Sequence, residues 1–476
     1  MDKVTKPSPG VGMPKPRLLI PVFTHFSVRY ILRTGMLTAL TEFAQPIVAL
    51  SWQDPALENE FSQAGAEILH VPNFTFSPQF KETRELVNFW HKQVRQTNTT
   101  EIDIRREASL LGLRERVNYE VQILKDRIKT ALPARIPHLL QQEESLFWSE
   151  TNYQEFDAIL DQSKPDAVFS ITPFVNKEEP LLRCAQKRGV LRITSILSFD
   201  NVTSRTRLPV SFEHYLVWNR YNHAELLRAY PDITPEQITI SGPPQFDFYY
   251  DSANVIPEEK WRSRLGLPSA RPVILFGGGT YKIVPNEPLF LKQLDDAISN
   301  GEVPAHPIIL FRRHPGDIAS RWQEVLSGVK NTFTDQSWQA NESRGQINIT
   351  HADIEQLCST LAHCAVQINS SSTLTVDGAV FDRPQIGPAY DPGSSRKYDR
   401  VLKELYIREH YIPITNSGGL DLVYSRPDFI RAVNDGFEKP AERTEGRKKI
   451  VEEICTYNDG QSTLRVVKKL RQLLGG

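Results

Sequence analysis

Three short stretches of the sequence concentrate residue types that bind phosphate groups. Arginine and histidine side chains donate charge-assisted hydrogen bonds to phosphate oxygens. Glycine-rich and serine-rich turns can present several backbone N–H groups to one anion. Together these groups suit a diphosphate. The stretches are Gly277, Gly278, Gly279 and Thr280; Arg312, Arg313 and His314; and Ser370, Ser371, Ser372 and Thr373.

Each of these stretches follows a short apolar run that is typical of a buried parallel strand. The runs are residues 273–276, 308–311 and 365–368. In an open parallel sheet, ligands bind beyond the carboxyl ends of the strands. We therefore expect the three stretches to line one crevice that binds a nucleotide-diphosphate donor.

The serine stretch leads into a helix predicted from the apolar spacing of residues 374–380. A helix start has unpaired N–H groups and a partial positive charge, which also suits phosphate. Asp377 lies in this helix and is included among the predicted donor-binding residues. The alternative is that the serines merely cap the helix.

A histidine follows the first predicted strand, residues 17–23. Thr24 and His25 would lie at the carboxyl end of that strand and face the same crevice. A histidine there can take a proton from an acceptor hydroxyl, because its pKa lies near working pH. The alternative is a loop histidine that only bonds the backbone.

A polar loop follows another buried run, residues 193–197. Its side chains Asp200, Asn201, Ser204 and Arg205 are candidates for the acceptor side of the crevice, with Asp200 the second candidate for the base. Turn formation by Asp and Asn explains part of this composition without any ligand.

The order of strands and helices predicts two doubly wound α/β domains that face a cleft. We expect an N-terminal Rossmann-like acceptor domain over 15–258, with a helical insertion at about 81–150 that is broken at Pro133 and Pro137. A C-terminal Rossmann-like donor domain would span 259–435, and its alternating order of strands and helices would continue through 411–414. A helical segment would follow over 436–476. Residues 1–14 predict a disordered tail rather than a signal peptide.

Composition excludes several classes of protein. The 476 residues carry a net charge of −1, which argues against a nucleic-acid binder. The four cysteines form no CxxC pair, and no run of about 18 apolar residues exists. We expect a cytoplasmic protein without a cofactor.

The helical insertion leaves one alternative open. Leu124, Ile128 and Leu132 line one side of a predicted helix, among positive residues such as Lys125 and Lys129. Such a helix can rest on an anionic membrane surface at the inner face of the membrane. The sequence favours the other interpretation, a helix packed on its own domain with a solvated face.

Five segments of the chain resemble the GT-B family of glycosyltransferases. They occur in the order seen in a bacterial branch that includes CDP-glycerol glycerophosphotransferases and related surface-polysaccharide enzymes. The resemblance covers roughly residues 15–435, apart from the insertion. The segments are SILSFDNVTSR, YLVWNRYNHAEL, ITISGPPQFDFY, LFRRHPGD and INSSSTLTVDGAVFDRPQIG.

The resemblance implies positions for the reacting groups. It puts donor phosphates near Ser370 to Thr373, Arg313 and His314 near the leaving diphosphate, and His25 beside the acceptor. No DxD motif is found, so the resemblance implies a metal-independent enzyme with no metal ligands. The cationic loops would stabilise the departing diphosphate.

The sequence also lacks the HGTP-like histidine loop of the glycerophosphotransferases. This favours glycosyl transfer from a nucleotide sugar to a carbohydrate or lipid-linked acceptor in cell-surface polysaccharide or glycolipid synthesis. We expect a single displacement at the anomeric carbon, with domain closure excluding water. Three alternatives stay open: a CDP-glycerol-type glycerophosphotransferase, an isomerase resembling non-hydrolysing UDP-sugar 2-epimerases, and a non-catalytic nucleotide-sugar-binding protein.

Overall fold

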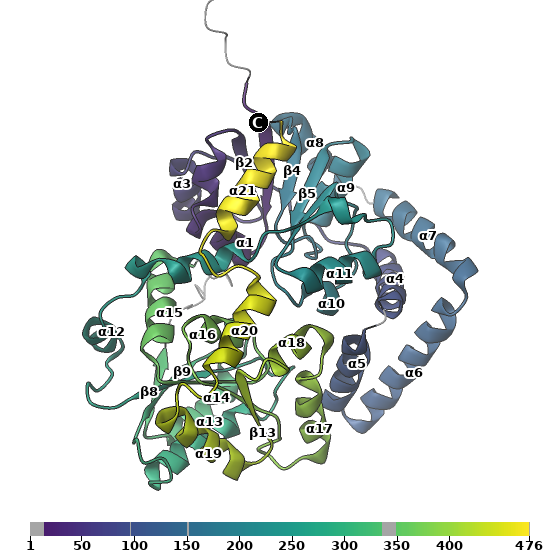
Figure 1. Cartoon of the computed structure of the whole chain (residues 1–476). Helices are drawn as coiled ribbons and strands as arrows, with labels where there is room; N and C mark the ends of the chain where they lie inside the picture. Colours follow the sequence, from purple (N-terminus) through teal and green to yellow (C-terminus); the bar gives the residue numbers. More distant parts are fainter. Residues whose placement is uncertain (1–13, 96, 150–151, 336–348, 476) are drawn as a thin grey trace, which may run out of the picture.

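The computed structural model describes residues 14–95, 97–149, 152–335 and 349–475. It contains two parallel β-sheets, each formed by a different half of the chain and flanked by helices (Figure 1). This arrangement confirms the predicted fold, two Rossmann-like α/β units with a helical insertion in the first. The predicted tail lies, except for residue 14, outside the described residues.

The first sheet has seven strands in the order β3-β2-β1-β4-β5-β6-β7. All of its strand pairs are parallel. Most of these strands are buried on both faces, which explains their nearly continuous apolar sequences. The strands are β1 (Arg17–Val22), β2 (Gln45–Leu50), β3 (Glu67–His70), β4 (Ala167–Ser170), β5 (Leu191–Ser195), β6 (His214–Val217) and β7 (Ile238–Ile240).

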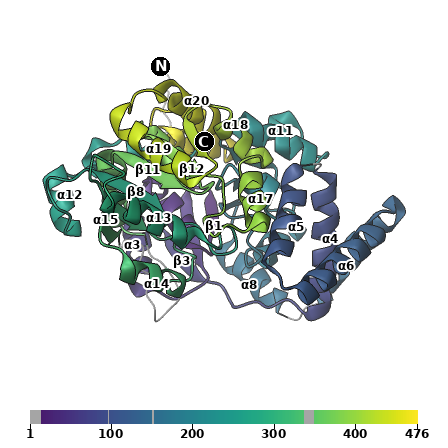
Figure 2. The same cartoon turned by 90° about the horizontal axis from the view of Figure 1, so that it is seen from below.

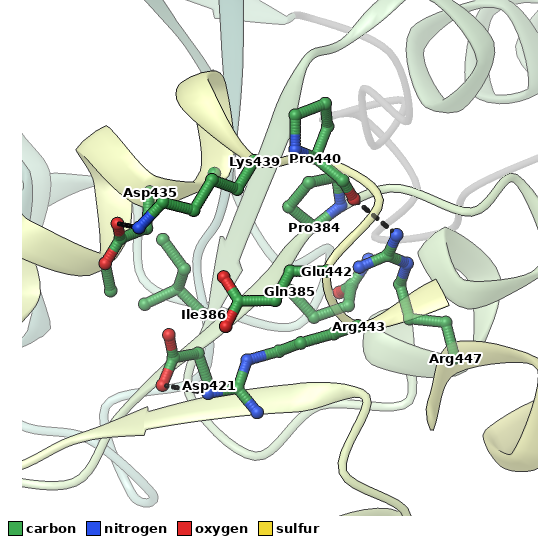
Figure 3. A pocket seen from close by; sticks show the side chains of 12 residues that line it. Pro384, Gln385, Ile386, Asp421, Asp435, Lys439, Pro440, Glu442, Arg443 and Arg447 are labelled. Atoms are coloured by element: carbon green, nitrogen blue, oxygen red, sulfur yellow. Dashed lines mark hydrogen bonds and ion pairs between the residues drawn. The ribbon is translucent and has the colours of Figure 1, made fainter. Parts of the chain in front are cut away.

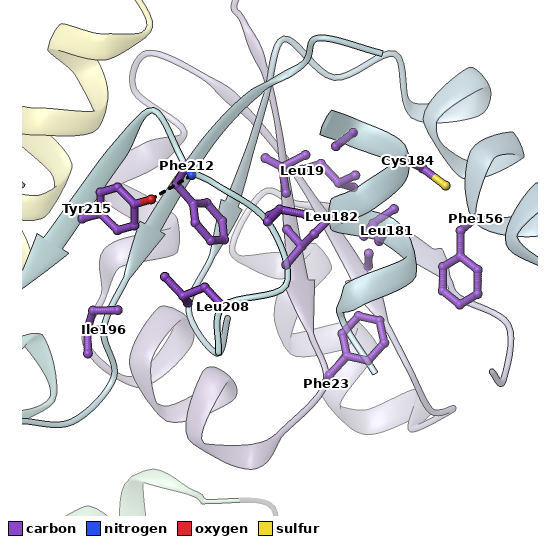
Figure 4. Packing of buried hydrophobic residues seen from close by; sticks show 14 of the residues in the cluster. Leu19, Phe23, Phe156, Leu181, Leu182, Cys184, Ile196, Leu208, Phe212 and Tyr215 are labelled. Carbon is purple, nitrogen blue, oxygen red and sulfur yellow. Dashed lines mark hydrogen bonds between the residues drawn. The ribbon is translucent and has the colours of Figure 1, made fainter. Parts of the chain in front are cut away.

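Alternate side chains of β1 enter two different apolar cores. Leu19 packs with Leu181 and Leu182 of one flanking helix (Figure 4), whereas Leu18 and Ile20 belong to the core on the other face. The period of two follows from the pleat of the strand. Because both faces are covered, only the ends of the strands are open to a ligand.

The second sheet has six strands in the order β10-β9-β8-β11-β12-β13, and all of its pairs are parallel too. Its register places Gly277 opposite both Arg312 and Asn369. The glycine, basic and serine stretches therefore leave the sheet at one level. The strands are β8 (Val273–Gly277), β9 (Ile308–Arg312), β10 (Thr332–Asp335), β11 (Val366–Asn369), β12 (Gln385–Pro388) and β13 (Leu420–Val423).

Helices fill the connections between the strands. None of the described helices is long and apolar enough to cross a membrane. Those before β8 are α1 (His25–Val28), η1 (Arg29–Arg33), α2 (Met36–Leu40), α3 (Pro55–Gln63), α4 (Pro78–Val94), α5 (Asn98–Leu110), α6 (Leu113–Thr130), η2 (Pro133–Arg135), α7 (Ile136–Ser149), α8 (Tyr153–Ser163), α9 (Glu179–Lys187), α10 (Asn201–Ser204), α11 (Arg220–Ala229), η3 (Pro235–Gln237), η4 (Pro244–Tyr250), η5 (Ser252–Asn254) and α12 (Glu258–Leu265). Those after β8 are α13 (Glu287–Ser299), α14 (Ser320–Gly328), α15 (His351–His363), α16 (Leu374–Val380), α17 (Arg396–Leu405), η6 (Glu409–Tyr411), α18 (Ile412–Thr415), α19 (Arg426–Glu438), α20 (Thr444–Cys455) and α21 (Ser462–Leu473).

The alternating strand–helix order predicted through 411–414 implies a strand at these residues, which is wrong. The chain is helical there, in η6 and α18, and Pro413 lies in the first turn of α18, where its missing N–H is not needed. The next strands in this region are instead β12 and β13. The sequence interpretation also missed β10 and β13, the two edge strands, because edge strands are less uniformly apolar than central ones.

The insertion consists of α4 to α7, which lie along one side of the molecule (Figure 1). The chain breaks at Pro133, as expected, but Pro137 lies within the first turn of α7. Helix α5 contacts α17 of the second half: Asn98 Nδ2 donates to the Ile407 carbonyl at 2.7 Å, and Arg105 pairs with Glu404 at 3.0 Å. The insertion thus touches both halves.

A buried ion network fixes the insertion to the first sheet. Arg84 of α4 pairs with Glu143 of α7 and with Glu179 of α9, and Arg183 bonds Glu179 at 2.7 Å. Glu179 has no exposed surface. A carboxylate in this position is tolerable only while its cationic partners remain.

We predict that Arg84→Ala lowers the free energy of unfolding by about 3–5 kcal/mol, since it strips a buried carboxylate of one partner. Urea denaturation followed by circular dichroism would measure this. The matched control is Arg188→Ala, whose partners Asp157 and Asp161 are at the surface, and which should cost less than about 1 kcal/mol. Equal effects of the two variants would contradict the assigned role of the network.

Candidate active site

The glycine and serine stretches are joined by a buried carboxylate that the sequence did not reveal. Glu287, at the start of α13, accepts a hydrogen bond from the Gly279 N–H at 2.6 Å, and the Ser370 side chain lies close enough to lower the pKa of Glu287. Arg321 pairs with it at 3.1 Å. The pKa of Glu287 is raised to about 7, because the effect of burial outweighs the opposite effect of the nearby Arg321. Glu287 therefore fixes the two loops relative to each other.

The glycines allow this part of the chain to pack closely. A Cβ atom on Gly277 would lie 2.4 Å from a methyl group of Leu374, and one on Gly278 would lie 3.0 Å from the Trp322 ring. Leu374 begins α16, so the small side chain lets the serine stretch approach β8. The carbonyl of Thr280 accepts hydrogen bonds from Ile283 and Val284 and forms the following turn.

The serine stretch divides into capping and free surfaces. Asn369 Oδ1 accepts from the Ser372 N–H at 3.2 Å, and Ser372 Oγ accepts from the Leu374 N–H at 3.2 Å. Ser372 thus satisfies the first N–H of α16, as the capping alternative expects of one serine, whereas the N-cap residue itself is Thr373, whose side chain makes no cap bond. Ser371 has a left-handed backbone, φ 49°, and Thr373 is exposed.

The basic stretch points in two directions. Arg312 is buried and bonds Asp335 of β10 at 2.6 Å, so it ties two strands together. Arg313 is half-buried and donates to the Asp317 carbonyl. His314 Nδ1 accepts from the Gly316 N–H at 3.0 Å, and desolvation lowers its pKa. His314 is therefore a neutral ring whose Nε2–H is available as a donor.

Asp377 lies inside the molecule. It accepts a hydrogen bond from the Tyr249 hydroxyl, which belongs to the connection between the two halves. Burial raises the pKa of Asp377, and the nearby Arg29 and Arg312 counteract this effect. The geometry therefore gives Asp377 a contact between the halves, beside its place in the predicted donor site.

His25 and Thr24 lie at the end of β1. The His25 ring is half-buried and lies 5.6 Å from the Trp52 ring, and burial lowers its pKa. At neutral pH the ring is uncharged and able to accept a proton. Thr24 Oγ1 accepts from the Ser27 N–H at 3.3 Å, which makes Thr24 the cap of α1.

The loop after β5 holds one compact polar cluster. The Asp200 carboxylate accepts hydrogen bonds from Ser198, from Ser204 at 2.9 Å and from Asn201 at 3.3 Å. Burial raises the pKa of Asp200, but its positive and hydrogen-bonding neighbours outweigh burial and lower it. Asp200 is thus ionised at neutral pH. The Arg205 side chain is exposed.

Two further residues, His410 and Arg408, connect this cluster to the serine stretch. His410 Nδ1 lies 2.9 Å from Thr203 Oγ1, and Arg408 Nη2 donates to Ser371 Oγ at 3.2 Å. Burial, followed by the charge of Arg408, lowers the pKa of His410 to about 3. Sequence interpretation missed both because it expected a strand just after them; the Arg-Glu-His triplet was the available signal.

Together these loops carry cationic, N–H and hydroxyl donors, the Asp200 carboxylate and the imidazoles of His25, His314 and His410. That set can hold a diphosphate and remove a proton from an incoming hydroxyl. A cavity of about 60 Å³ lies between Gln385, Asp421 and Arg443 (Figure 3). It adjoins the first residues of β12 and β13, at the end of the sheet opposite the loops, and we do not include it in the site.

A comparison with family models identifies residues 193–472 as CDP-glycerol:poly(glycerophosphate) glycerophosphotransferase. The chain belongs to this family. The match confirms a transferase family and the predicted resemblance. It includes the Asp200 loop, all three predicted phosphate-binding stretches, Arg408 and His410, but begins after His25. No curated protein matches the sequence.

Solved structures share the fold of this glycerophosphotransferase-family chain at low sequence identity. MnaA from S. aureus with UDP has a TM-score of 0.55 at 10% identity, over 96% of this chain and 97% of that one. A putative UDP-N-acetylglucosamine 2-epimerase from Listeria monocytogenes has 0.55 at 10%, over 97% of each chain. A glycosyltransferase from Rickettsia africae has 0.50 at 12%, over 96% and 98%. These likenesses confirm the GT-B-like fold.

We predict that Arg313→Ala weakens binding of CDP by about 1.5–3 kcal/mol, the scale of a charge-assisted hydrogen bond. Isothermal titration calorimetry would measure the change. Arg431→Ala is the matched control, because Arg431 is exposed on α19 and pairs only locally with Asp428. An Arg313 variant that is folded and binds CDP like the wild type would show that Arg313 does not contact the diphosphate.

Proposed function

We propose that this chain transfers a glycerophosphoryl group from CDP-glycerol to an acceptor hydroxyl. The supporting observation is the family match, which spans every phosphate-binding stretch of the site. It favours the glycerophosphotransferase alternative over the glycosyl transfer that the sequence favoured. The acceptor would be a carbohydrate or lipid-linked polyol of the cell envelope, modified on the cytoplasmic side.

In the proposed step, the acceptor oxygen attacks the phosphorus that carries glycerol. A new P–O bond forms between the acceptor oxygen and this phosphorus. The bond from this phosphorus to the oxygen that bridges the two phosphates breaks, and CMP leaves with the electron pair. The leaving phosphate gains negative charge as this happens. Arg313 and the Nε2–H of His314 are suited to stabilise it.

His25 is the proposed general base. Its lowered pKa leaves the ring neutral at pH 7, so its lone pair can accept the acceptor's proton. Asp200 is the second candidate, ionised and within the family match. A carboxylate with a lowered pKa is the weaker base of the two, which is why we assign the role to His25 first.

The nucleotide product tests the reaction type. Incubation of the enzyme with CDP-glycerol and a poly(glycerophosphate) acceptor should release CMP, measured by chromatography, and lengthen the acceptor. Release of a nucleoside diphosphate from a nucleotide sugar, with no CMP formed from CDP-glycerol, would overturn the proposal and establish glycosyl transfer instead.

Glycosyl transfer remains the second candidate because the sequence lacks the HGTP-like loop. The fold is also shared with a glycosyltransferase and with 2-epimerases. Incubation with UDP-N-acetylglucosamine and no acceptor distinguishes isomerisation from transfer, because only an epimerase forms a product from this substrate alone. A non-catalytic binder would be stabilised by nucleotides in a thermal-shift assay and turn over none of these substrates.

We predict that His25→Ala lowers kcat by about a hundred- to ten-thousand-fold and leaves CDP affinity near the wild-type value. The rising limb of the wild-type pH profile should have its midpoint below the usual histidine pKa of 6.5, because burial lowers the pKa of His25. His25→Gln and His25→Asn control for lost hydrogen bonding. If all three variants retain wild-type turnover and Asp200→Asn does not, Asp200 is the base.

A further inference from the structure

Helix α6 exposes an apolar stripe that no other part of the described chain covers. Its six members follow one another at intervals of three or four residues. The first five share one face of the helix, and Leu132 continues the series just after the helix ends. Leu113, Leu124 and Ile128 are 84%, 58% and 61% exposed. Helix α6 has no buried residue. The α6 stripe consists of Leu113, Val117, Val121, Leu124, Ile128 and Leu132.

The sequence favoured a helix packed on its own domain with a solvated face, and α6 does contact α4 and α5, but its apolar stripe lies on the solvated side. The less exposed residues of α6 lie on the face opposite the stripe. Tyr119 donates to Glu107 of α5 at 2.8 Å, and Ile123 and Asp126 are half-buried. Figure 2 shows α6 extending beyond α4 and α5 at the edge of the molecule.

Positive side chains border the stripe on both sides. With 3.6 residues per turn, Arg114, Lys125 and Lys129 follow one edge of it. Arg116 and Arg127 follow the other edge, where Arg116 pairs with Glu120 at 2.7 Å and Arg127 pairs with Glu101 of α5 at 2.8 Å. The outward surface therefore combines apolar side chains with a surplus of cations along the first edge.

We propose that the α6 stripe docks the protein on an anionic lipid bilayer. A helix that lies in the membrane interface has an apolar face flanked by Lys and Arg, and α6 is about 27 Å long, enough to lie along the surface. A second copy of the chain is the less suitable occupant, because one edge of its α6 stripe is cationic and the other carries neutral ion pairs, so neither edge would neutralise Arg114, Lys125 and Lys129.

The structure also gives this docking a consequence. The insertion is anchored rigidly: its buried Arg84 network joins it to the first sheet, and α5 contacts α17 of the second half. Arg95, at the end of α4, donates to the carbonyls of Val202 and Arg205 in the Asp200 loop. A membrane-bound α6 would therefore hold the candidate active site at a fixed position relative to the bilayer.

Sedimentation of the full-length protein with phosphatidylcholine vesicles, with and without phosphatidylglycerol, tests the proposal. The protein should bind at least about tenfold more tightly to the vesicles that contain phosphatidylglycerol, and added salt should weaken this binding. The double variant Leu124→Gln/Ile128→Gln should lose at least about tenfold in partitioning, because it removes two large apolar groups. Arg114→Glu/Lys125→Glu should lose the preference for anionic lipid.

The matched control is Leu289→Gln/Leu464→Gln, which changes two exposed leucines on other helices and should bind like the wild type. Circular dichroism should show that all variants are folded, as expected for changes at exposed sites. Wild-type protein that stays in the supernatant, or Leu124→Gln/Ile128→Gln that sediments like the wild type, would overturn the proposal. So would light scattering that shows a wild-type dimer dissociated by the same variant, since the stripe would then join two copies.

Discussion

The site depends on one constraint: loops from two separate sheets have to meet in a fixed relation. Parallel sheets leave only their strand ends open, so each half of the chain can supply only part of the proposed diphosphate and hydroxyl site. The contacts of His410 with Thr203 and of Arg408 with Ser371 connect these parts. His410 and Arg408 are buried, and a buried polar contact is costly to break without a replacement partner.

Carboxylates with no direct place at the reacting atoms maintain this relation. Glu287 holds the glycine and serine stretches together, Asp377 meets Tyr249 of the connection between the halves, and Asp335 holds Arg312. The insertion supports the facing loop from outside, through Arg95. Arg313 and His314, which we propose contact the ligand, are thus held in position by neighbours that take no part in the proposed reaction.

The sequence predicted the parts of the site that follow central strands. Apolar runs before Gly277, Arg312 and Ser370 were strong signals, because buried parallel strands are nearly continuous in hydrophobicity. Glu287 and His410 gave no such signal, since their roles come from contacts between distant segments. The two edge strands of the second sheet, β10 and β13, were missed because they are less apolar than the central strands. The exposure of the α6 stripe was missed because an amphipathic pattern alone does not say which face of a helix is covered. Residue patterns also could not decide between phosphoryl and glycosyl transfer, because both reactions use the same kinds of diphosphate-binding groups.

The central claim is that the three stretches of the second sheet bind the donor diphosphate opposite the Asp200 loop. A crystal structure of the chain with CDP-glycerol tests it most directly. We expect the diphosphate within hydrogen-bond distance of Arg313, His314 and the serine stretch, with the glycerol end toward His25 and Asp200. A donor bound elsewhere, such as in the cavity of about 430 Å³ lined by Trp90, Arg207 and Tyr230, would contradict it.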